Sequence, residues 1–188
     1  MNTTKKWRKI KLGNICSINA EFYSAKESWR FANYLDTGNI TENKIASIQY
    51  IDLTREELPI RARRKVKNNS IVYSTVRPNQ RHYGIIKTCP DNFLVSTGFA
   101  VIDADTQILD AFFLYYYLTQ TSVVEKLHSI AAQSTSAYPS IRPSDIEDLE
   151  IDIPDIGKQR SIATILECID DKIELNTRIN QNLEVCAA

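Results

Sequence analysis

The sequence predicts an α+β fold, in which one mixed domain over residues 1–154 is followed by a long coiled-coil-type helix over residues 155–188. Short segments with alternating or β-branched side chains, typical of strands, recur through the first half of the chain. Two helical segments then follow one another directly, without the strand–helix–strand rhythm of a parallel sheet. The final part repeats apolar side chains at heptad spacing, which favours a helix that pairs with another helix.

Four segments are expected to form strands, because alternating or β-branched side chains fill them and turn residues punctuate them. They are WRKIKL (7–12), SIVYSTV (70–76), HYGIIK (82–87) and FLVSTGFAVI (93–102). The last of these contains Gly98, which predicts a bulge or a close approach of another backbone segment.

Two consecutive segments are expected to be helical. ILDAFFLYYYLTQ (108–120) is apolar on nearly every side, which predicts a buried helix. SVVEKLHSIA (122–131) continues it, with apolar side chains at helical spacing.

The segment before the last helix is closely specified. Pro143 keeps Arg142 out of the helical conformation, so Ser144 is predicted to cap a short helix, with Glu147 completing a capping box. LEIDI (149–153) then alternates apolar and acidic side chains, which predicts a half-exposed strand that ends at the next proline.

From Asp155 onward the chain predicts one helix of about 30 residues, roughly 45 Å long. With Ile162 at heptad position a, Asn176 also falls at a, where this residue type fixes the register of paired helices. The predicted helix-pairing residues are Ile162, Ile165, Leu166, Ile169, Ile173, Asn176, Ile179 and Leu183. The alternative is a terminal helix folded back over the sheet.

Composition excludes several classes of protein. Of the 188 residues, 43% are apolar and 24% charged, which is ordinary for a folded soluble protein. No run reaches the roughly 18 apolar residues of a membrane span, and the basic start lacks the pattern of a secretory signal. The 4 cysteines are scattered, which predicts reduced thiols, no metal site and a cytoplasmic location.

Charge is divided along the sequence although the formal net charge is zero. Residues 1–90 hold 17 Lys and Arg against 7 Asp and Glu, and residues 91–188 hold 6 against 16. The first part is therefore expected to meet phosphates and the second to meet something else. The alternative is that the two halves interleave in space and cancel.

A basic run and a polar loop in the first half form the candidate DNA-binding site. Arginine can read guanine edges, Asn and Gln can read adenine edges, and lysine can neutralise phosphates. The candidate residues are Arg61, Arg63, Arg64, Lys65, Lys67, Arg77, Asn79, Gln80, Arg81 and His82. The alternative is an ordinary solvated charged face.

No catalytic motif is recognisable. The sequence lacks a phosphate-binding loop and the Asp/Asn-Pro-Pro-aromatic motif of an amino-methyltransferase, and His82 and His128 lie in no nucleophile arrangement. We therefore expect no catalytic residues, no cofactor and no metal. An enzyme with an unrecognised motif stays open, whereas an acidic mimic of DNA is contradicted by the basic first half.

Four stretches carry a resemblance to one half of the specificity subunit of a type I restriction-modification system. They are WRKIKLGNI (7–15), SIVYSTVRPNQRHYGIIK (70–87) with NFLVSTGFAVI (92–102), SAYPSIRPSDIEDLEIDIP (136–154), and QRSIATILECIDDKIELNTRINQNLE (159–184). Members of the family resemble two tandem copies of a target recognition domain, each followed by a long helix, and the two helices pair antiparallel and set the distance between two half-sites in DNA.

The resemblance implies a non-catalytic subunit that directs adenine methylation and restriction to a bipartite target. It also implies partners: double-stranded DNA, methyltransferase subunits, and a restriction subunit reached through the complex. Only one copy is present, so the chain resembles either a fragment or a half-subunit that forms a homodimer through its C-terminal helix, acting as a dimeric DNA-binding module.

Overall fold

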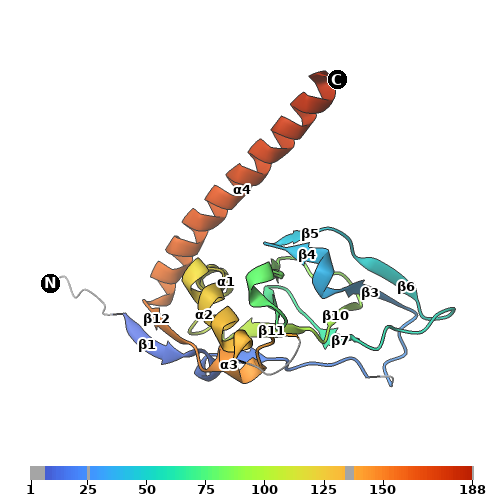
Figure 1. Cartoon of the computed structure of the whole chain (residues 1–188), viewed down its shortest axis with the longest axis horizontal. Helices are drawn as coiled ribbons and strands as arrows, with labels where there is room; N and C mark the ends of the chain where they lie inside the picture. The colour runs from blue at the N-terminus through green and yellow to red at the C-terminus, as the bar shows by residue number, and fades with distance from the viewer. Residues whose placement is uncertain (1–6, 25, 134–137, 188) are drawn as a thin grey trace.

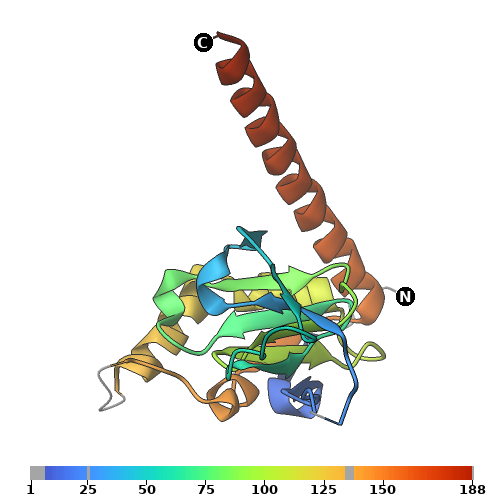
Figure 2. The same cartoon turned by 90° about the vertical axis from the view of Figure 1, so that its right-hand side faces the viewer.

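The structure, a computed structural model, describes residues 7–24, 26–133 and 138–187, with side chains up to residue 183. A mixed body, residues 7–154, carries one long helix that leaves it at an angle (Figures 1 and 2). Within the described residues, no helix combines the length and the apolarity needed to cross a bilayer.

The body contains many short strands. They are β1 (Arg8–Lys11), β2 (Cys16–Ile18), β3 (Phe31–Leu35), β4 (Ile40–Thr41), β5 (Lys44–Ile45), β6 (Gln49–Asp52), β7 (Ala62–Lys65), β8 (Ser70–Ser74), β9 (Tyr83–Ile86), β10 (Phe93–Ser96), β11 (Phe99–Ala104) and β12 (Glu150–Ile153). The helices are η1 (Leu12–Asn14), η2 (Thr37–Asn39), η3 (Pro78–Gln80), α1 (Ala111–Leu118), α2 (Thr121–Ala132), α3 (Pro143–Glu147) and α4 (Ile156–Ala187).

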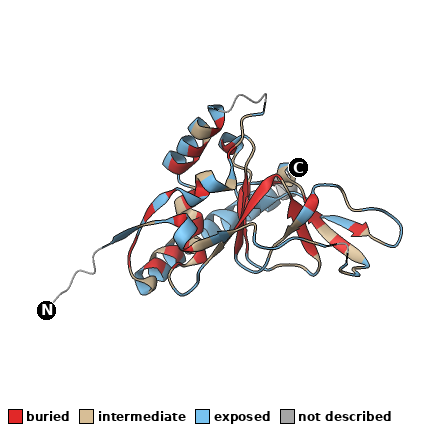
Figure 3. Cartoon of the chain, turned by 90° about the horizontal axis from the view of Figure 1, so that it is seen from below, coloured by how far each residue is buried: buried red, intermediate tan, exposed pale blue. Residues whose placement is uncertain are grey.

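Two four-stranded sheets, ordered β2-β11-β8-β9 and β6-β3-β10-β7, stack on each other, and β1-β12 and β4-β5 form two smaller pairs. Alternation along β8 explains the layers: Val72 packs toward the second sheet, whereas Ile71 and Tyr73 pack toward α1 and α2. Buried positions therefore lie along the central strands (Figure 3). This arrangement confirms the predicted α+β class.

The predicted strand over residues 93–102 is wrong, because the chain turns at Thr97-Gly98 and β10 and β11 belong to different sheets. The turn is fixed by the backbone N–H of Thr97, which donates to the carbonyl oxygen of Arg61 at 2.8 Å. A Cβ on Gly98 would lie 2.9 Å from Cγ2 of Thr37, so what lies close to this glycine is a side chain rather than the expected backbone segment.

The buried helix was predicted correctly, but it ends at Leu118, and α2 is a separate helix. Asp110 begins α1, because its carboxylate accepts hydrogen bonds from the backbone N–H groups of Phe112 and Phe113 at 3.1 and 3.0 Å.

The predicted cap of α3 at Ser144 is also wrong. The helix begins at Pro143, whose missing N–H suits the first helical position. The carboxylate of Asp145, not that of Glu147, accepts from the backbone N–H of Arg142 at 2.7 Å. Strand β12 follows as expected and pairs antiparallel with β1, so that Arg8 faces Ile153.

Helix α4 has 32 residues, or roughly 48 Å at 1.5 Å per residue. Asp155 precedes it and accepts from the backbone N–H of Lys158 at 3.2 Å. Every described side chain from Cys168 to Leu183 is exposed, so this helix does not fold back over the sheet.

Candidate nucleic-acid interface and helix surface

Some of the candidate DNA-binding residues lie together at one end of the stacked sheets. Strands β8 and β10 end there, and β7 and β11 begin there, since β8 and β10 each run antiparallel to one of these neighbours. The backbone N–H of Thr75 donates to the carbonyl oxygen of Gly98 at 2.8 Å, next to the contact between Thr97 and Arg61. Arg61 and the segment leading to Arg77 therefore share this end of the sheets.

The loop from Arg77 to Arg81 has a fixed shape. Both residues lie in the left-handed region, with φ of 47° and 56°, which costs a non-glycine residue about 1–2 kcal/mol. Hydrogen bonds hold it there: the N–H of Arg77 donates to Pro139 at 2.9 Å, and the carbonyl oxygen of Arg81 accepts from the N–H of Glu42 at 2.9 Å. Asn79 and Gln80 are thus presented to solvent by a preorganised turn.

The polar side chains of this loop differ in how they are engaged. The guanidinium of Arg77 is exposed and lies 5.8 Å from the ring centroid of Tyr138. Arg81 forms an ion pair with Glu42 at 2.9 Å, and this hydrogen bond raises the pKa of Arg81. His82 is half-buried, and its Nδ1 lies 2.7 Å from the carbonyl oxygen of Ile40, which can only accept, so Nδ1 carries the proton.

Arg61 lies beside an acidic group at the same end of the sheets. Burial opposes ionisation of Asp36, but hydrogen bonds from Thr37, Ser96 and Tyr34 and the charge of Arg61 together hold the pKa of Asp36 below its ordinary value. The Arg61 side chain itself is exposed, so a polyanion could compete with Asp36 for it.

The rest of the basic run is engaged within the protein. Arg64 donates to Oδ1 of Asn19 at 2.7 Å, and burial lowers the pKa of its guanidinium. Lys65 forms an ion pair with Glu27 and lies over the ring of Trp29. Lys67 lies at the opposite end of the sheets, 3.4 Å from a carboxylate oxygen of Asp103. These three cations therefore have structural partners.

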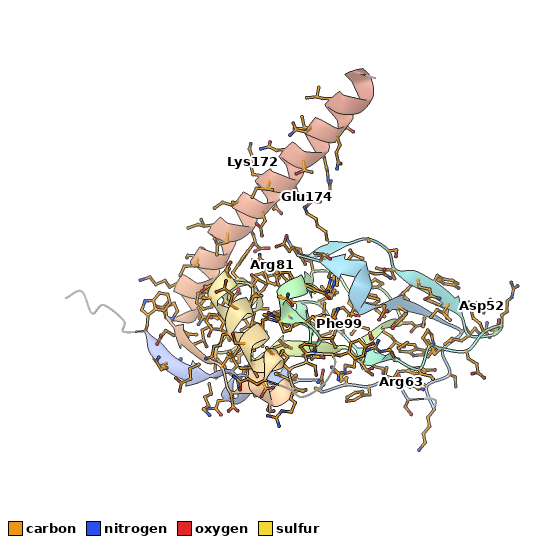
Figure 4. All side chains as sticks on the ribbon, viewed as in Figure 1. Asp52, Arg63, Arg81, Phe99, Lys172 and Glu174 are labelled. Carbon is orange, nitrogen blue, oxygen red and sulfur yellow. The ribbon has the colours of Figure 1, made fainter. Side chains whose placement is uncertain are left out.

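The ten predicted DNA-binding residues thus fall into two groups, those at the preorganised end of the sheets and those elsewhere. Arg63 is exposed and lies on a different side of the body from Arg81, which faces toward α4 (Figure 4). The residues brought together at the preorganised end are Arg61, Arg77, Asn79, Gln80, Arg81 and His82. Sequence reasoning missed the contact between Arg77 and the ring of Tyr138. Tyr138 lies in one of the stretches that carry the resemblance.

The division of charge along the sequence is partly cancelled in space. Within the described residues, five ion pairs join the basic half to the acidic half: Lys9–Asp152, Lys11–Asp148, Lys67–Asp103, Lys87–Glu167 and Lys87–Asp171. The acidic residues around α3 and β12 therefore face the basic strand β1, as the alternative interpretation of the charge pattern required.

A stripe of apolar side chains runs along the free part of α4. Its members are 46% to 62% exposed: Ile165, Ile169, Ile173, Leu175, Ile179 and Leu183. Leu175 lies at a heptad position outside the predicted seam. Ile162 and Leu166, by contrast, are partly buried, and Ile162 packs on the core of the body.

Apart from Ile173, which lines a hollow between α4 and the β4–β5 hairpin, the stripe faces away from the body. Ala163 is buried in the core, and the side of α4 that continues from it carries Asp170 and Glu174. At about 100° per residue, the centre of the stripe lies roughly 160° around the helix from this side. The body therefore leaves the apolar face of α4 uncovered.

Comparison with known proteins gives the family. Residues 4–185 match the family model described as "Type I restriction modification DNA specificity domain". The chain belongs to this family. The match covers nearly all of the described residues, including the preorganised loop and α4. The resemblance carried by the four sequence stretches is therefore confirmed.

Relatives and solved structures agree. The chain is 33% identical to the type I restriction enzyme HindI specificity subunit of Haemophilus influenzae, over 96% of this chain and 39% of that protein. It is 27% identical to the MjaIX specificity subunit of Methanocaldococcus jannaschii, over 97% and 42%. The HsdS subunit from Thermoanaerobacter tengcongensis has the same fold, with a TM-score of 0.78 and 24% identity over 94% of this chain and 45% of that one. The chain thus spans about two fifths of these curated relatives' length.

Proposed function

We propose that this specificity domain recognises one half of a bipartite DNA target, and that it directs adenine methylation and restriction there without catalysing either. The observation that carries the proposal is the preorganised loop from Arg77 to Arg81, which offers arginine and amide side chains on a domain of this family. Its shape is fixed before binding, so little conformational entropy is lost when it enters a groove.

The proposed partners follow from the same assignment. Double-stranded DNA would meet the end of the sheets that carries Arg61 and Arg77, while methyltransferase subunits would supply the chemistry and a restriction subunit would join through the complex. A cytoplasmic location follows from these partners.

The uncovered stripe of α4 supports a second part of the proposal, a homodimer through the C-terminal helix. Two α4 helices paired antiparallel would cover both stripes and place two bodies at opposite ends, related by a two-fold axis. The target would then be an inverted repeat, with the helix setting the spacer, and Asn176 would select one register. In a longer natural chain, a second copy would supply the same helix.

A titration of duplex DNA tests the recognition surface. The complex of the chain with its cognate methyltransferase subunits is selected on random duplexes to find the target, and affinity is then measured by fluorescence anisotropy at several salt concentrations. Arg77→Ala should weaken binding by about 1–3 kcal/mol if the side chain reads a base. The matched control is Lys67→Ala, which removes a cation that is already paired at the opposite end of the sheets.

Three results are informative. Weaker binding by the Arg77 variant with nearly unchanged binding by the Lys67 variant supports the proposed surface. Equal losses in both variants would mean that the whole basic run, rather than the loop, faces DNA. Specific binding that survives Arg77→Ala, Asn79→Ala and Gln80→Ala together would refute the loop as the reader. Co-purification distinguishes the complex from a stand-alone dimeric DNA-binding module, which would bind the target without methyltransferase subunits.

A further inference from the structure

The root of α4 is pinned by one buried side chain. Gln159 is fully buried, and its Oε1 accepts from the backbone N–H of Asp110 at 2.9 Å. Its Nε2 donates to the carbonyl oxygens of Ile108 and Pro154, both at 3.0 Å. The first turn of α4 is therefore bonded to the segment that leads into α1.

A second attachment lies about two turns further along α4. Nζ of Lys87 lies 3.4 Å from Oε1 of Glu167 and 3.9 Å from Oδ1 of Asp171. The hydroxyl of Tyr116 donates to Oδ2 of Asp170 at 2.8 Å. We call Lys87, Tyr116 and these three carboxylates the clasp.

The clasp is the last attachment before α4 runs free. Nζ of Lys87 also lies 5.5 Å from the ring centroid of Phe112, so this residue of α1 contacts the lysine as well. Beyond it, a hollow lined by Lys44, Ile45, Ile173 and Glu174 separates α4 from the β4–β5 hairpin. Between the two attachments, Ala163 is buried in the core and Ile162 packs on it, so the clasp is the outermost of the contacts that set the angle at which α4 leaves the body.

Strand β9 connects the clasp to the recognition loop. It begins immediately after His82 and ends immediately before Lys87. All four of its residues are buried, and all four are paired with β8. The loop and the clasp are therefore the two ends of one rigid strand.

We infer that Lys87 and Tyr116 are positioning residues that fix the angle between α4 and the recognition loop, and thereby select the spacer between two half-sites. The inference rests on the proposed function. From Asp171 to Ala187 the helix extends about 24 Å beyond the clasp, since each residue adds 1.5 Å. A swing of about 10° would move its end by about 4 Å, close to the 3.4 Å that separates successive base pairs. Spacer choice would therefore depend on the clasp as well as on helix length.

The test uses the complex of the full chain with its methyltransferase subunits. Duplexes carry the two half-sites separated by the natural spacer or by one base pair more or fewer, and methylation rates are compared within one reaction. A duplex with a single half-site measures recognition alone. The wild-type complex should prefer the natural spacer strongly.

The variants remove the clasp without touching the loop. Lys87→Ala should reduce the preference for the natural spacer by about threefold, as expected for exposed ion pairs. The combination with Tyr116→Phe should reduce it by about tenfold. Lys87→Arg keeps the cation and should behave as the wild type does. The matched control Lys126→Ala removes an exposed lysine from α2 and should change nothing.

The outcomes separate this inference from the proposed function. Relaxed spacer choice with unchanged binding to the single half-site supports the clasp. Unchanged spacer choice in the double variant overturns it, even when recognition is intact. Single half-site binding that falls as much as spacer choice relaxes also overturns it, because Lys87 would then belong to the recognition surface. A wild-type complex that neither binds nor methylates any target refutes the proposed function itself.

Discussion

Replacing Gln159 by leucine should destabilise the protein by about 3 kcal/mol. Leucine fills a similar volume, but it can neither accept from the N–H of Asp110 nor donate to the carbonyl oxygens of Ile108 and Pro154. Three hydrogen bonds at about 0.5–1.5 kcal/mol each are lost, and three backbone groups lose their partners. A side chain with no exposed surface has no route to solvent that could relieve this cost.

The measurement is equilibrium unfolding in urea, followed by circular dichroism at one protein concentration. With a slope of about 2 kcal/mol per molar urea, the midpoint should fall by about 1.5 M. The protein with Gln159 and the Gln159→Leu variant should both also carry Ile169→Asp, so that association does not contribute to the free energy of unfolding. Gln181→Leu is the matched control, because that side chain is exposed on the same helix and its loss should change stability by less than about 0.5 kcal/mol. A variant at residue 159 as stable as this control would refute the pin at the root of α4.

Two further predictions concern the stripe and the cysteines. Ile169→Asp should convert the proposed dimer into a monomer at micromolar concentration in sedimentation velocity, because it places a charge in the uncovered stripe; a wild-type chain that is already monomeric would contradict the dimer. Burial, reinforced by two nearby carboxylates, raises the pKa of Cys16 to about 12, so its reactive thiolate stays scarce at pH 8. Iodoacetamide should therefore label the exposed Cys168 and leave Cys16 unmodified in peptide mass spectra, and rapid labelling of Cys16 would contradict its raised pKa.

Patterns that depend on periodicity predicted the fold well. The heptad spacing from Ile162 to Leu183 identified α4 and its apolar stripe, because a helix that leaves the body is governed by its own sequence. The alternation of Leu149, Ile151 and Ile153 likewise identified β12. The pairing of β12 with β1 could not be predicted from the sequence, because no local pattern indicates which distant strand pairs with a given strand.

Errors arose where distant residues decide the local structure. Thr97 turns the chain between two sheets because Arg61 accepts its N–H, and these residues are far apart in sequence. The error at α3 was instead local: Pro143 occupies the first helical position, so Arg142 rather than Ser144 is the N-cap, and the carboxylate of Asp145 accepts its backbone N–H.

The candidate site shows the same limit. The sequence predicted that all the cations of the basic run were equally available to DNA. In the structure, Lys65 and Lys67 form ion pairs with Glu27 and Asp103, whereas Arg77 is exposed. Composition cannot separate a cation that holds the fold together from one that is available to a ligand. Gln159 and Lys87 were missed for a related reason: their roles lie in contacts with segments far away in sequence.

The pairing of β1 with β12 means that the chain enters and leaves the body side by side. Arg8 faces Ile153, and α4 begins just beyond that strand. Everything between the two strands can therefore be exchanged as a cassette while both junctions keep their places, as in domains whose ends lie close together. Such an exchange would install a new loop at residues 77–81 on an unchanged scaffold. Recombination at these two strands could therefore change the DNA sequence that the proposed reader recognises. Each exchanged segment would need to keep Lys87 and Tyr116.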